Sequence, residues 1–323
     1  MKPKEFREYI AQLSSLSLKQ RESLRKILEA PTQSQPMAVR EVEARLAENP
    51  LGPHCGSPRL GKWGVVKALP RFRCKDCKRT FNALTGTPLA HLQKKDCWDQ
   101  FAACLQKSET VRGSAEECGV HRNTTFRWRH RFLAWISENK PPALHGVVEV
   151  DETFFLESQK GSRHMNRRPR KRSGKASKPG RSREQICVLV ARDRGGQTTD
   201  FILPTFSAEV VDGLLSLVMD RDAMLCTDGA KVYATFAKKR GLLHEAVNIS
   251  AGERVRAQTI HLQNVNGEYS RFNSWIAKFH GVSTRWLPND LGWRRMLDGR
   301  DRRLSPVVVL KSALSMIDFN TLR

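Results

Sequence analysis

The chain has 323 residues and carries 56 Lys and Arg against 33 Asp and Glu, a formal net charge of +23. This length predicts two or three domains with a sizeable core, and the charge favours a polyanionic partner such as nucleic acid. No stretch approaches the roughly 20 apolar residues of a membrane span, and residues 1–8 lack the apolar region of a signal peptide. Eight cysteines in so long a chain suit reduced thiols and a metal site. The composition therefore excludes a membrane protein, a secreted disulfide scaffold and an acidic disordered chain, and it predicts a cytoplasmic protein.

Residues 1–48 have the apolar spacing of helices. Residues 1–30 predict a helical pair, in which Ser17 and Gln20 can form a capping box. A polar segment then precedes a charged helix at residues 39–47. We expect this N-terminal helical region to be a small docking hairpin followed by a third helix.

Residues 49–92 predict a zinc-ribbon-like module. Three cysteines have the spacing of zinc ligands: Cys55, Cys74 and Cys77. Thiolates on two turns about twenty residues apart can hold a tetrahedral Zn²⁺. The first knuckle has Gly52 where a cysteine would complete the set, so His54 is the candidate for a fourth ligand. The alternative is a ribbon without metal that folds on its aromatic core.

Residues 93–140 predict three helical pieces, of which the last two have the pattern of a helix-turn-helix. A short helix at residues 110–117 is followed by a turn with Gly119 and a longer helix from His121. The longer helix is expected to expose side chains that read base edges and hold phosphates. These are Arg122, Asn123, Thr124, Arg127 and Arg129. A plain helical bundle with a basic face is the alternative.

Residues 141–323 alternate between strand and helix patterns, which predicts a mixed α/β domain. Apolar runs predict strands at residues 147–150, 186–191, 198–203 and 223–227. Helices are predicted after a cap at Ser207, at residues 231–239, and from about residue 265 to residue 279.

A basic insertion at residues 160–183 separates the first two predicted strands of this domain. It contains eleven Lys or Arg residues and no acid, and it has too little apolar surface to fold alone. We expect a mobile arm that grips DNA phosphates. The candidate contacts are Arg167, Arg168, Arg170, Lys171 and Arg172. A solvated loop is the alternative.

Two apolar strands in this basic chain end in an aspartate. Asp151 follows the run VVEV, and Asp228 follows AMLCT and precedes a glycine. Two carboxylates at one edge of a sheet can share Mg²⁺, and a two-metal site of this kind can serve phosphodiester cleavage. For either aspartate alone, an ordinary turn residue is the alternative.

The segments around these aspartates resemble the DDE-superfamily transposases of bacterial insertion sequences. The resemblance rests on VEVDETFF around Asp151, TDGAKVY around Asp228 and HLQNVNGEYSRFNSWIAKFHGV from His261. PHCGS, FRCKDCKRTFNALTGTPLA, YATF and LGWRRML agree as well, and they point to the ISXO-like group with an N-terminal zinc ribbon. The likeness covers nearly the whole chain.

The resemblance implies an RNase H-like catalytic domain in which Asp151 and Asp228 bind Mg²⁺ and Asn266 takes the third position of the triad. The family branch that has Asn at this position also has Lys seven residues on, where this chain has Asn273. We also expect Glu152, Glu268 and His261 to be candidates for supporting groups near the site.

A transposase would act on double-stranded DNA, namely the terminal inverted repeats of its element and the target DNA. It would assemble on DNA as a homo-oligomer, at least a dimer, because two DNA ends are joined in one event, and it would associate with the bacterial nucleoid. The alternative is a catalytically impaired, transposase-derived DNA-binding protein, which Gly52 and Asn273 favour. A third reading is an RNase H-like nuclease that cuts DNA without joining it.

Overall fold

The structure is a computed structural model. It describes residues 15–18, 20–21, 36–67, 69–141, 143–170, 174–177, 182–247, 252, 255–256, 259–298 and 304–314. In these residues the predicted capping box is present, because Ser17 N donates to Gln20 Oε1 at 2.9 Å and Gln20 N donates to Ser17 Oγ at 3.4 Å. The rest of the predicted N-terminal helical pair lies outside the described residues. No helix in the described ranges is long and apolar enough to cross a membrane.

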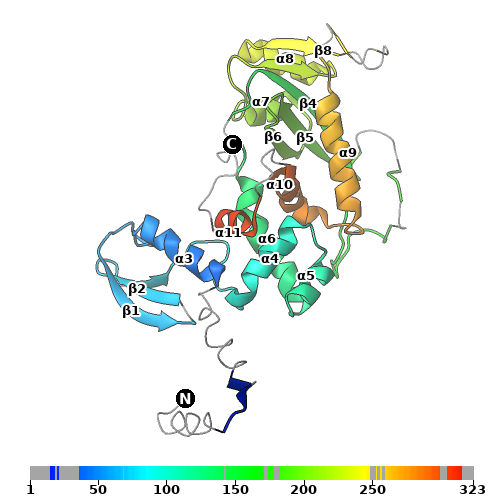
Figure 1. The fold of residues 1–323 in the computed structure, drawn as a ribbon. Coiled ribbons are helices and arrows are strands. Elements are labelled where there is room, and N and C mark those ends of the chain that lie inside the picture. Colours follow the sequence, from blue (N-terminus) through cyan, green and yellow to red (C-terminus); the bar gives the residue numbers. More distant parts are fainter. Residues whose placement is uncertain are drawn as a thin grey trace.

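The N-terminal module combines one helix with a small antiparallel sheet (Figure 1). Its elements are α3 (Met37–Glu48), β1 (Leu60–Val66), β2 (Leu69–Cys74) and β3 (Thr80–Asn82). Phe72 and Phe81 face each other across β2 and β3 with their ring centroids 5.8 Å apart. The sheet therefore has an aromatic packing face, as the sequence predicts.

A helical region follows, and helices from the C-terminal end of the chain pack into it. Its elements are η1 (Lys95–Cys97), α4 (Trp98–Gln106), α5 (Val111–Glu117), α6 (Arg122–Glu138), η3 (Thr284–Trp286), α10 (Leu287–Asp298) and α11 (Pro306–Ala313). Trp98, Phe101 and Phe132 share one core with Trp293 and Leu310. The helices α10 and α11, which fall in the predicted domain at residues 141–323, therefore share the core of α3, α4 and α6.

The second sheet has five strands in the order β6-β5-β4-β7-β8. Its strands are β4 (Val147–Leu156), β5 (Gln185–Asp193), β6 (Thr198–Leu203), β7 (Met224–Thr227) and β8 (Leu243–Ala246). β4 pairs antiparallel with β5 and parallel with β7, and β8 is parallel to β7. β4 is therefore the central strand of the sheet.

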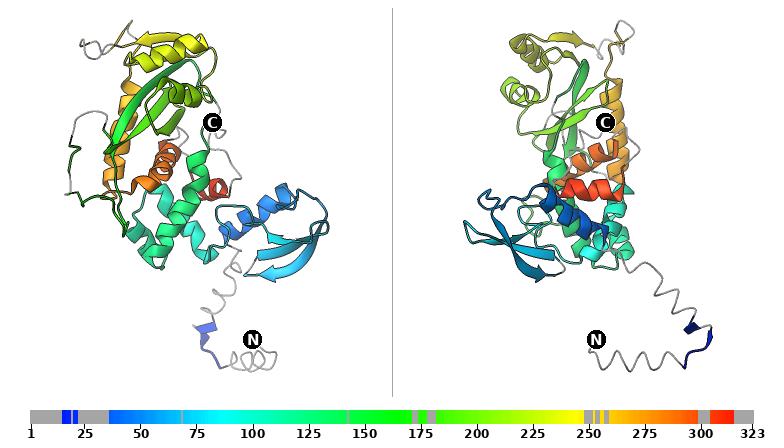
Figure 2. Two further views of the ribbon diagram at one scale, coloured as in Figure 1. Left: turned by 180° about the vertical axis from the view of Figure 1, so that it is seen from behind. Right: turned by 60° about the vertical axis from the view of Figure 1, so that its left-hand side comes forward.

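Helices cover both faces of this sheet (Figure 2). α7 (Ala208–Leu215) and α8 (Lys231–Arg240) pack on one face, and α9 (Gln263–Ala277) packs on the other. The mixed α/β architecture that the sequence predicts is confirmed, and it is compatible with an RNase H-like transposase domain.

The predicted elements of this domain are present with small changes in their ends. The strand at 198–203 is confirmed as β6, and Ser207 caps α7 by accepting a hydrogen bond from Val210 N. β4 continues six residues past the predicted end at 150, so Asp151 lies inside the strand rather than after it. β8, α10 and α11 were not predicted.

Candidate functional site

The central strand β4 carries the first candidate catalytic aspartate. Side chains alternate between the two faces of a strand, so Glu149 and Asp151 point to the same face. Glu149 is fully buried, whereas Asp151 is only partly covered. The Asp151 carboxylate accepts a hydrogen bond from its neighbour, Glu152 N, at 2.8 Å.

The second aspartate lies directly after the neighbouring strand β7. The parallel pairing of β4 and β7 sets Glu149 opposite Cys226, and two residues further along both chains are Asp151 and Asp228. Asp228 is exposed, and its Oδ1 accepts a hydrogen bond from Ala230 N at 3.0 Å. This short turn passes through Gly229, which has φ +86° and where a Cβ would lie 3.2 Å from Ala246 Cβ. The turn therefore holds Asp228, at the end of β7, level with Asp151 in the middle of β4.

The electrostatics of the pair fit a cation site. Burial, together with the negative charges of Glu152 and Asp228, raises the pKa of Asp151 to about 7. Two carboxylates that disfavour each other's ionisation become compatible when a cation lies between them. Their oxygen ligands are the type that Mg²⁺ prefers, so the donor set fits this ion.

The third candidate residue lies on α9, which is attached to β4 beside Asp151. The Tyr269 hydroxyl donates a hydrogen bond to the backbone carbonyl of Asp151. Asn266 and Asn273 are exposed, three residues before and four residues after Tyr269. Residues at these spacings share one side of a helix. The structure thus brings Asp151 and Asp228 together and places both asparagines on the side of α9 that carries Tyr269.

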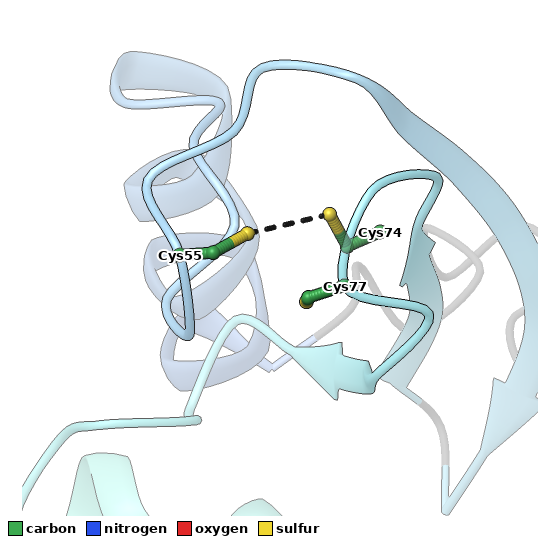
Figure 3. A group of neighbouring side chains, drawn as sticks. All are labelled: Cys55, Cys74 and Cys77. Carbon is green, nitrogen blue, oxygen red and sulfur yellow. Dashed lines mark hydrogen bonds between the residues drawn. The ribbon is translucent and has the colours of Figure 1, made fainter.

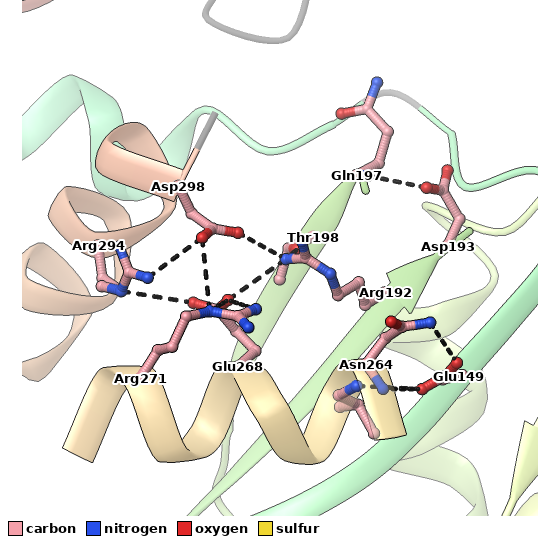
Figure 4. A network of polar contacts seen from close by, with 11 residues as sticks. Glu149, Arg192, Asp193, Gln197, Thr198, Asn264, Glu268, Arg271, Arg294 and Asp298 are labelled. Atoms are coloured by element: carbon pink, nitrogen blue, oxygen red, sulfur yellow. Dashed lines mark hydrogen bonds and ion pairs between the residues drawn. The ribbon is translucent and has the colours of Figure 1, made fainter. Parts of the chain in front are cut away.

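Figure 4 shows two polar networks around α9, whose residues sequence reasoning assigned only loosely or missed. Glu268 forms ion pairs with Arg192, Arg271 and Arg294 at 3.3, 2.6 and 3.6 Å, beside Asp298. This network joins α9 to β5 and α10, so Glu268 stabilises the domain and does not face the aspartates.

Glu149 was not singled out by the sequence, although an acid inside an apolar strand is a detectable signal. Its carboxylate accepts hydrogen bonds from the start of α9 and lies 3.4 Å from His261 Nδ1. Glu152 points to the other face of β4 and accepts the Tyr233 hydroxyl hydrogen at 2.7 Å. His261 and Glu152 therefore support the neighbouring helices α9 and α8.

Three thiols form a separate cluster in the N-terminal module (Figure 3). The sulfur atoms of Cys55, Cys74 and Cys77 all lie within 4.8 Å of one another, and Cys55 Sγ is 3.6 Å from Cys74 Sγ. Backbone N–H groups of Cys77 and Asp76 point to the Cys74 sulfur and lower the pKa of this thiol to about 7. A thiolate is the form that binds metal, so the donor set fits Zn²⁺ with three of its four ligands.

The fourth corner of this cluster is the position of Gly52. A Cβ added to Gly52 would lie 3.8 Å from Cys74 Cβ. His54 is exposed and is not part of the group of ligand atoms within 4.8 Å. The structure therefore gathers the three predicted cysteines but does not bring His54 to them.

The two predicted helices are present as α5 and α6, with a turn at Gly119 (φ +58°) between them. Thr110 and His121 are their N-caps rather than their first residues, and α6 extends to Glu138. Thr110 caps α5, and Arg122, Asn123 and Arg127 at the start of α6 are exposed, with Thr124 half-buried. Arg122, Asn123 and Arg127 are therefore exposed as the sequence predicts, whereas Thr124 is exposed only in part.

Arg129 is a correction to this prediction, because only 6% of it is exposed. Its guanidinium lies over the Trp293 ring at 4.7 Å and donates to the Glu109 carbonyl. Burial lowers the pKa of Arg129 to about 10. Arg129 follows Arg127 by two residues, about 200° around the helix, so the two point to opposite sides. Arg129 therefore links α6 to α10 and does not contact DNA.

The basic insertion also departs from its prediction in part. Arg167 and Arg170 both reach Glu157 at the end of β4, and Arg167 Nε is 2.9 Å from Glu157 Oε2. Lys160 Nζ donates to the carbonyls of His280 and Gly281. These basic side chains hold the described part of the insertion against the domain. Arg168 remains exposed, whereas Lys171 and Arg172 lie outside the described residues.

Comparison with known proteins adds independent findings. Residues 143–292 match the family model of the ISXO2-like transposase domain. The chain is also similar to a protein of Halobacterium salinarum that is described as an uncharacterized protein in transposable element ISH50. The two sequences are 27% identical over 237 residues, which cover 72% of this chain and 79% of the relative. The matched domain contains β4, β7 and α9, the three elements that carry Asp151, Asp228 and Asn266.

Proposed function

Because this chain is an insertion-sequence transposase of the ISXO-like group, with an ISXO2-like transposase domain at residues 143–292, we propose that it cuts and joins DNA at the ends of its element. The observation that carries the proposal is the parallel register of β4 and β7, which sets Asp151 of β4 level with Asp228 at the end of β7.

Asp151 and Asp228 would hold Mg²⁺, and Asn266 would complete the site with a neutral oxygen. Bound there, Mg²⁺ would stabilise the negative charge that develops on the phosphate oxygens during phosphodiester cleavage. The raised pKa of Asp151 and the exposure of Asp228 support this assignment, since a cation beside both carboxylates would favour their ionised forms.

Two in-line phosphoryl transfers account for the reaction. Water first attacks the phosphorus atom at the element end and releases a 3′-hydroxyl, which then attacks a phosphodiester of the target DNA. Neither step needs a covalent bond to the protein. Asn273 stands where the related branch has Lys, so this chain offers a hydrogen-bond donor to phosphate at that position without a positive charge.

DNA recognition is assigned to the helix-turn-helix formed by α5 and α6. The exposed Arg122, Asn123 and Arg127 at the start of α6 suit contacts with base edges and phosphates of the terminal inverted repeats. Arg168 in the basic insertion would add a phosphate contact, and the net charge of +23 favours long-range attraction to DNA.

The N-terminal module is proposed to be a zinc ribbon with three thiolate ligands, whose fourth ligand is water. We propose an assembly of at least a dimer on DNA, because both element ends enter one reaction, and a nucleoid-associated location in the cytoplasm.

A direct test is incubation of the full chain with Mg²⁺ and DNA that carries the sequences flanking its own gene. Nicked products together with joined products are expected. Nicked products alone would favour a nuclease, and binding without either product would contradict the proposal.

The second candidate function is a transposase-derived protein that binds DNA and has lost most of its catalysis. Asn273 is the observation that favours it, because the position is exposed on the same side of α9 as Asn266 yet carries no charge. This second candidate function predicts that the chain binds the DNA but gives no Mg²⁺-dependent nicked or joined products in the same experiment.

A further inference from the structure

The N-cap residue of α9 offers no side-chain cap. His261 Nδ1 accepts a hydrogen bond from Gln263 N at 3.3 Å, but the next two N–H groups of the helix need partners from elsewhere. The first N–H groups of a helix have no partner within the helix and are usually satisfied by a side-chain oxygen of the N-cap residue. In α9 that residue is Leu262, which has no side-chain oxygen and makes no capping hydrogen bond. Because Leu262 is 2% exposed, water does not readily replace the missing cap.

Glu149 of β4 supplies the missing hydrogen bonds from 115 and 116 residues away in the chain (Figure 4). Its Oε2 accepts from Asn264 N at 2.8 Å and from Val265 N at 3.1 Å, and its Oε1 accepts from Asn264 Nδ2 at 2.8 Å. These backbone groups belong to the second and third residues of the helix, which are the groups that an N-cap side chain normally satisfies.

A fully buried carboxylate is costly unless its charge and oxygen atoms are satisfied. Glu149 is 0% exposed, and Arg194 Nη2 and His261 Nδ1 lie 3.1 and 3.4 Å from its Oε1. A negative charge at a helix N-terminus also interacts favourably with the helix dipole. An apolar side chain would fill the same space without any of these partners, so packing alone does not account for a glutamate here.

We propose that Glu149 is a positioning residue that sets the location of Asn266 relative to Asp151 and Asp228. The proposal rests on the function proposed above, in which Asn266 completes the site. Asn266 directly follows Val265, whose N–H is bound to Glu149, and Asp151 follows Glu149 on the same face of β4. The Tyr269 hydroxyl, one helical turn after Asn266, binds the Asp151 carbonyl. Asn266 is therefore held between two attachments to β4.

The test is the variant Glu149→Gln, which keeps the size of the side chain and removes its charge and one acceptor. The rate of Mg²⁺-dependent cleavage is measured in single turnover at saturating DNA carrying the element ends. We expect a fall on the order of tenfold to a hundredfold, because small displacements in an active site have effects of this size. The affinity for that DNA is expected to stay unchanged, since Glu149 is buried far from the basic face of α6.

Asp212→Asn is the matched control. Asp212 is a carboxylate of the same domain that ties α7 to α8 through Lys239 and Arg240. It should lower thermal stability without changing the single-turnover rate. If Glu149→Gln behaves in the same way, the residue is only structural and the positioning role is wrong.

A second variant and a second measurement keep the proposal testable in every case. Asn264→Ala removes only the side-chain donor and should slow cleavage several-fold even if Glu149→Gln does not fold. In that case, an unchanged rate for Asn264→Ala would overturn the proposal.

Hydrogen exchange of residues 259–268 tests the capping role without a cleavage assay. Loss of Glu149 or of the Asn264 amide should speed exchange at the first turn of α9 and leave its second half protected. If the wild-type protein does not cleave DNA, the proposed function is wrong. If hydrogen exchange at the start of α9 is equal in wild type and variant, the capping role of Glu149 is wrong.

Discussion

Asn273 is exposed on α9, seven residues and about two turns beyond Asn266. A Lys ammonium at this position can contact a phosphate oxygen, and a charge-assisted hydrogen bond contributes about 1.5–3 kcal/mol. If the contact acts mainly in the transition state, Asn273→Lys should speed cleavage about tenfold to a hundredfold and tighten DNA binding less. Single-turnover rates and binding constants on the same DNA give the comparison.

The neighbouring exposed residue Ser274 provides the control, since it lies about 100° further around the helix. Ser274→Lys adds the same charge on another side of α9 and should change the rate little. A rate for Asn273→Lys identical to that of wild type would remove the role assigned to this position.

Gly52 occupies the place of a fourth ligand beside the three thiols. Because a Cβ there would lie 3.8 Å from Cys74 Cβ and the backbone is not in the left-handed region, Gly52→Cys should complete a Cys₄ site. We expect weak zinc binding by the wild type, insensitive to His54→Ala, and one tightly bound zinc per chain in Gly52→Cys. Competition with a chelator, read by elemental analysis, measures both. Gly61→Cys adds a thiol elsewhere in the sheet and should not tighten binding; equal affinity in all variants would contradict the site.

At the level of single residues, sequence reasoning selected the aspartates and cysteines but not the residues that support them. Asp151 and Asp228 can be found because each interrupts an apolar run in a basic chain. Arg129 was placed on the DNA-facing side because it is a basic residue of the helix expected to contact DNA, but its burial depends on Trp293, 164 residues later. Glu149 was missed for the same reason, since its partners Asn264 and Val265 are distant in sequence.

Two arginines of α6 point to opposite sides of the helix, and their substitutions distinguish a role in DNA contact from a role in packing. Arg127 is exposed and Arg129 is buried. Arg127→Ala should weaken DNA binding and reduce the slope of log affinity against log salt by about 1, as expected for the loss of one phosphate contact. Arg129→Ala should lower the unfolding temperature. The slope of log affinity against log salt, measured on the folded protein, should stay unchanged. Equal slopes for Arg127→Ala and wild type would remove α6 from the DNA interface.

Among the elements, those with a regular apolar period were predicted and those with an interrupted period were not. α10 contains Pro288 at its start and Gly292 within it, two residues that argue against a helix in sequence. The structure explains the glycine, because a Cβ on Gly292 would lie 2.8 Å from Ser137 Cα of α6. The close approach of α6 and α10 therefore requires Gly292, the same residue that argues against a helix in the sequence. β8 was missed because its four residues, LHEA, include a histidine and a glutamate and form no apolar run.

Considered as a whole, the molecule joins its helical region to the sheet domain through α10, and a buried aspartate lies in this junction. Asp290 is 3% exposed, its Oδ2 has no hydrogen-bond partner among the residues that the structure describes, and burial raises its pKa to about 7 despite the charge of Arg129. In the unfolded chain its pKa is about 3.9. The folded protein therefore favours the protonated form, and this contribution to stability is present below about pH 4 and lost as the pH rises through about 7.

Asp290→Asn removes this dependence because the amide does not titrate. The difference in the free energy of unfolding, variant minus wild type, should increase by about 3 kcal/mol when the pH is raised from about 5 to about 8. Urea unfolding of both proteins at the two pH values measures the difference. Parallel pH profiles would show that Asp290 is ionised in the folded protein and that its pKa is not raised.

The central claim is that Asp151 and Asp228 form one metal-dependent catalytic site, and paired substitutions test it most directly. Asp151→Ala and Asp228→Ala are compared with Asp222→Ala, an exposed aspartate in the turn before β7. With Mg²⁺ and DNA carrying the element ends, each catalytic variant should lose both cutting and joining. DNA binding should persist or tighten, because negative charge near phosphate is removed, and Asp222→Ala should react as wild type does. Cleavage at the wild-type rate by either Asp151→Ala or Asp228→Ala would contradict the account.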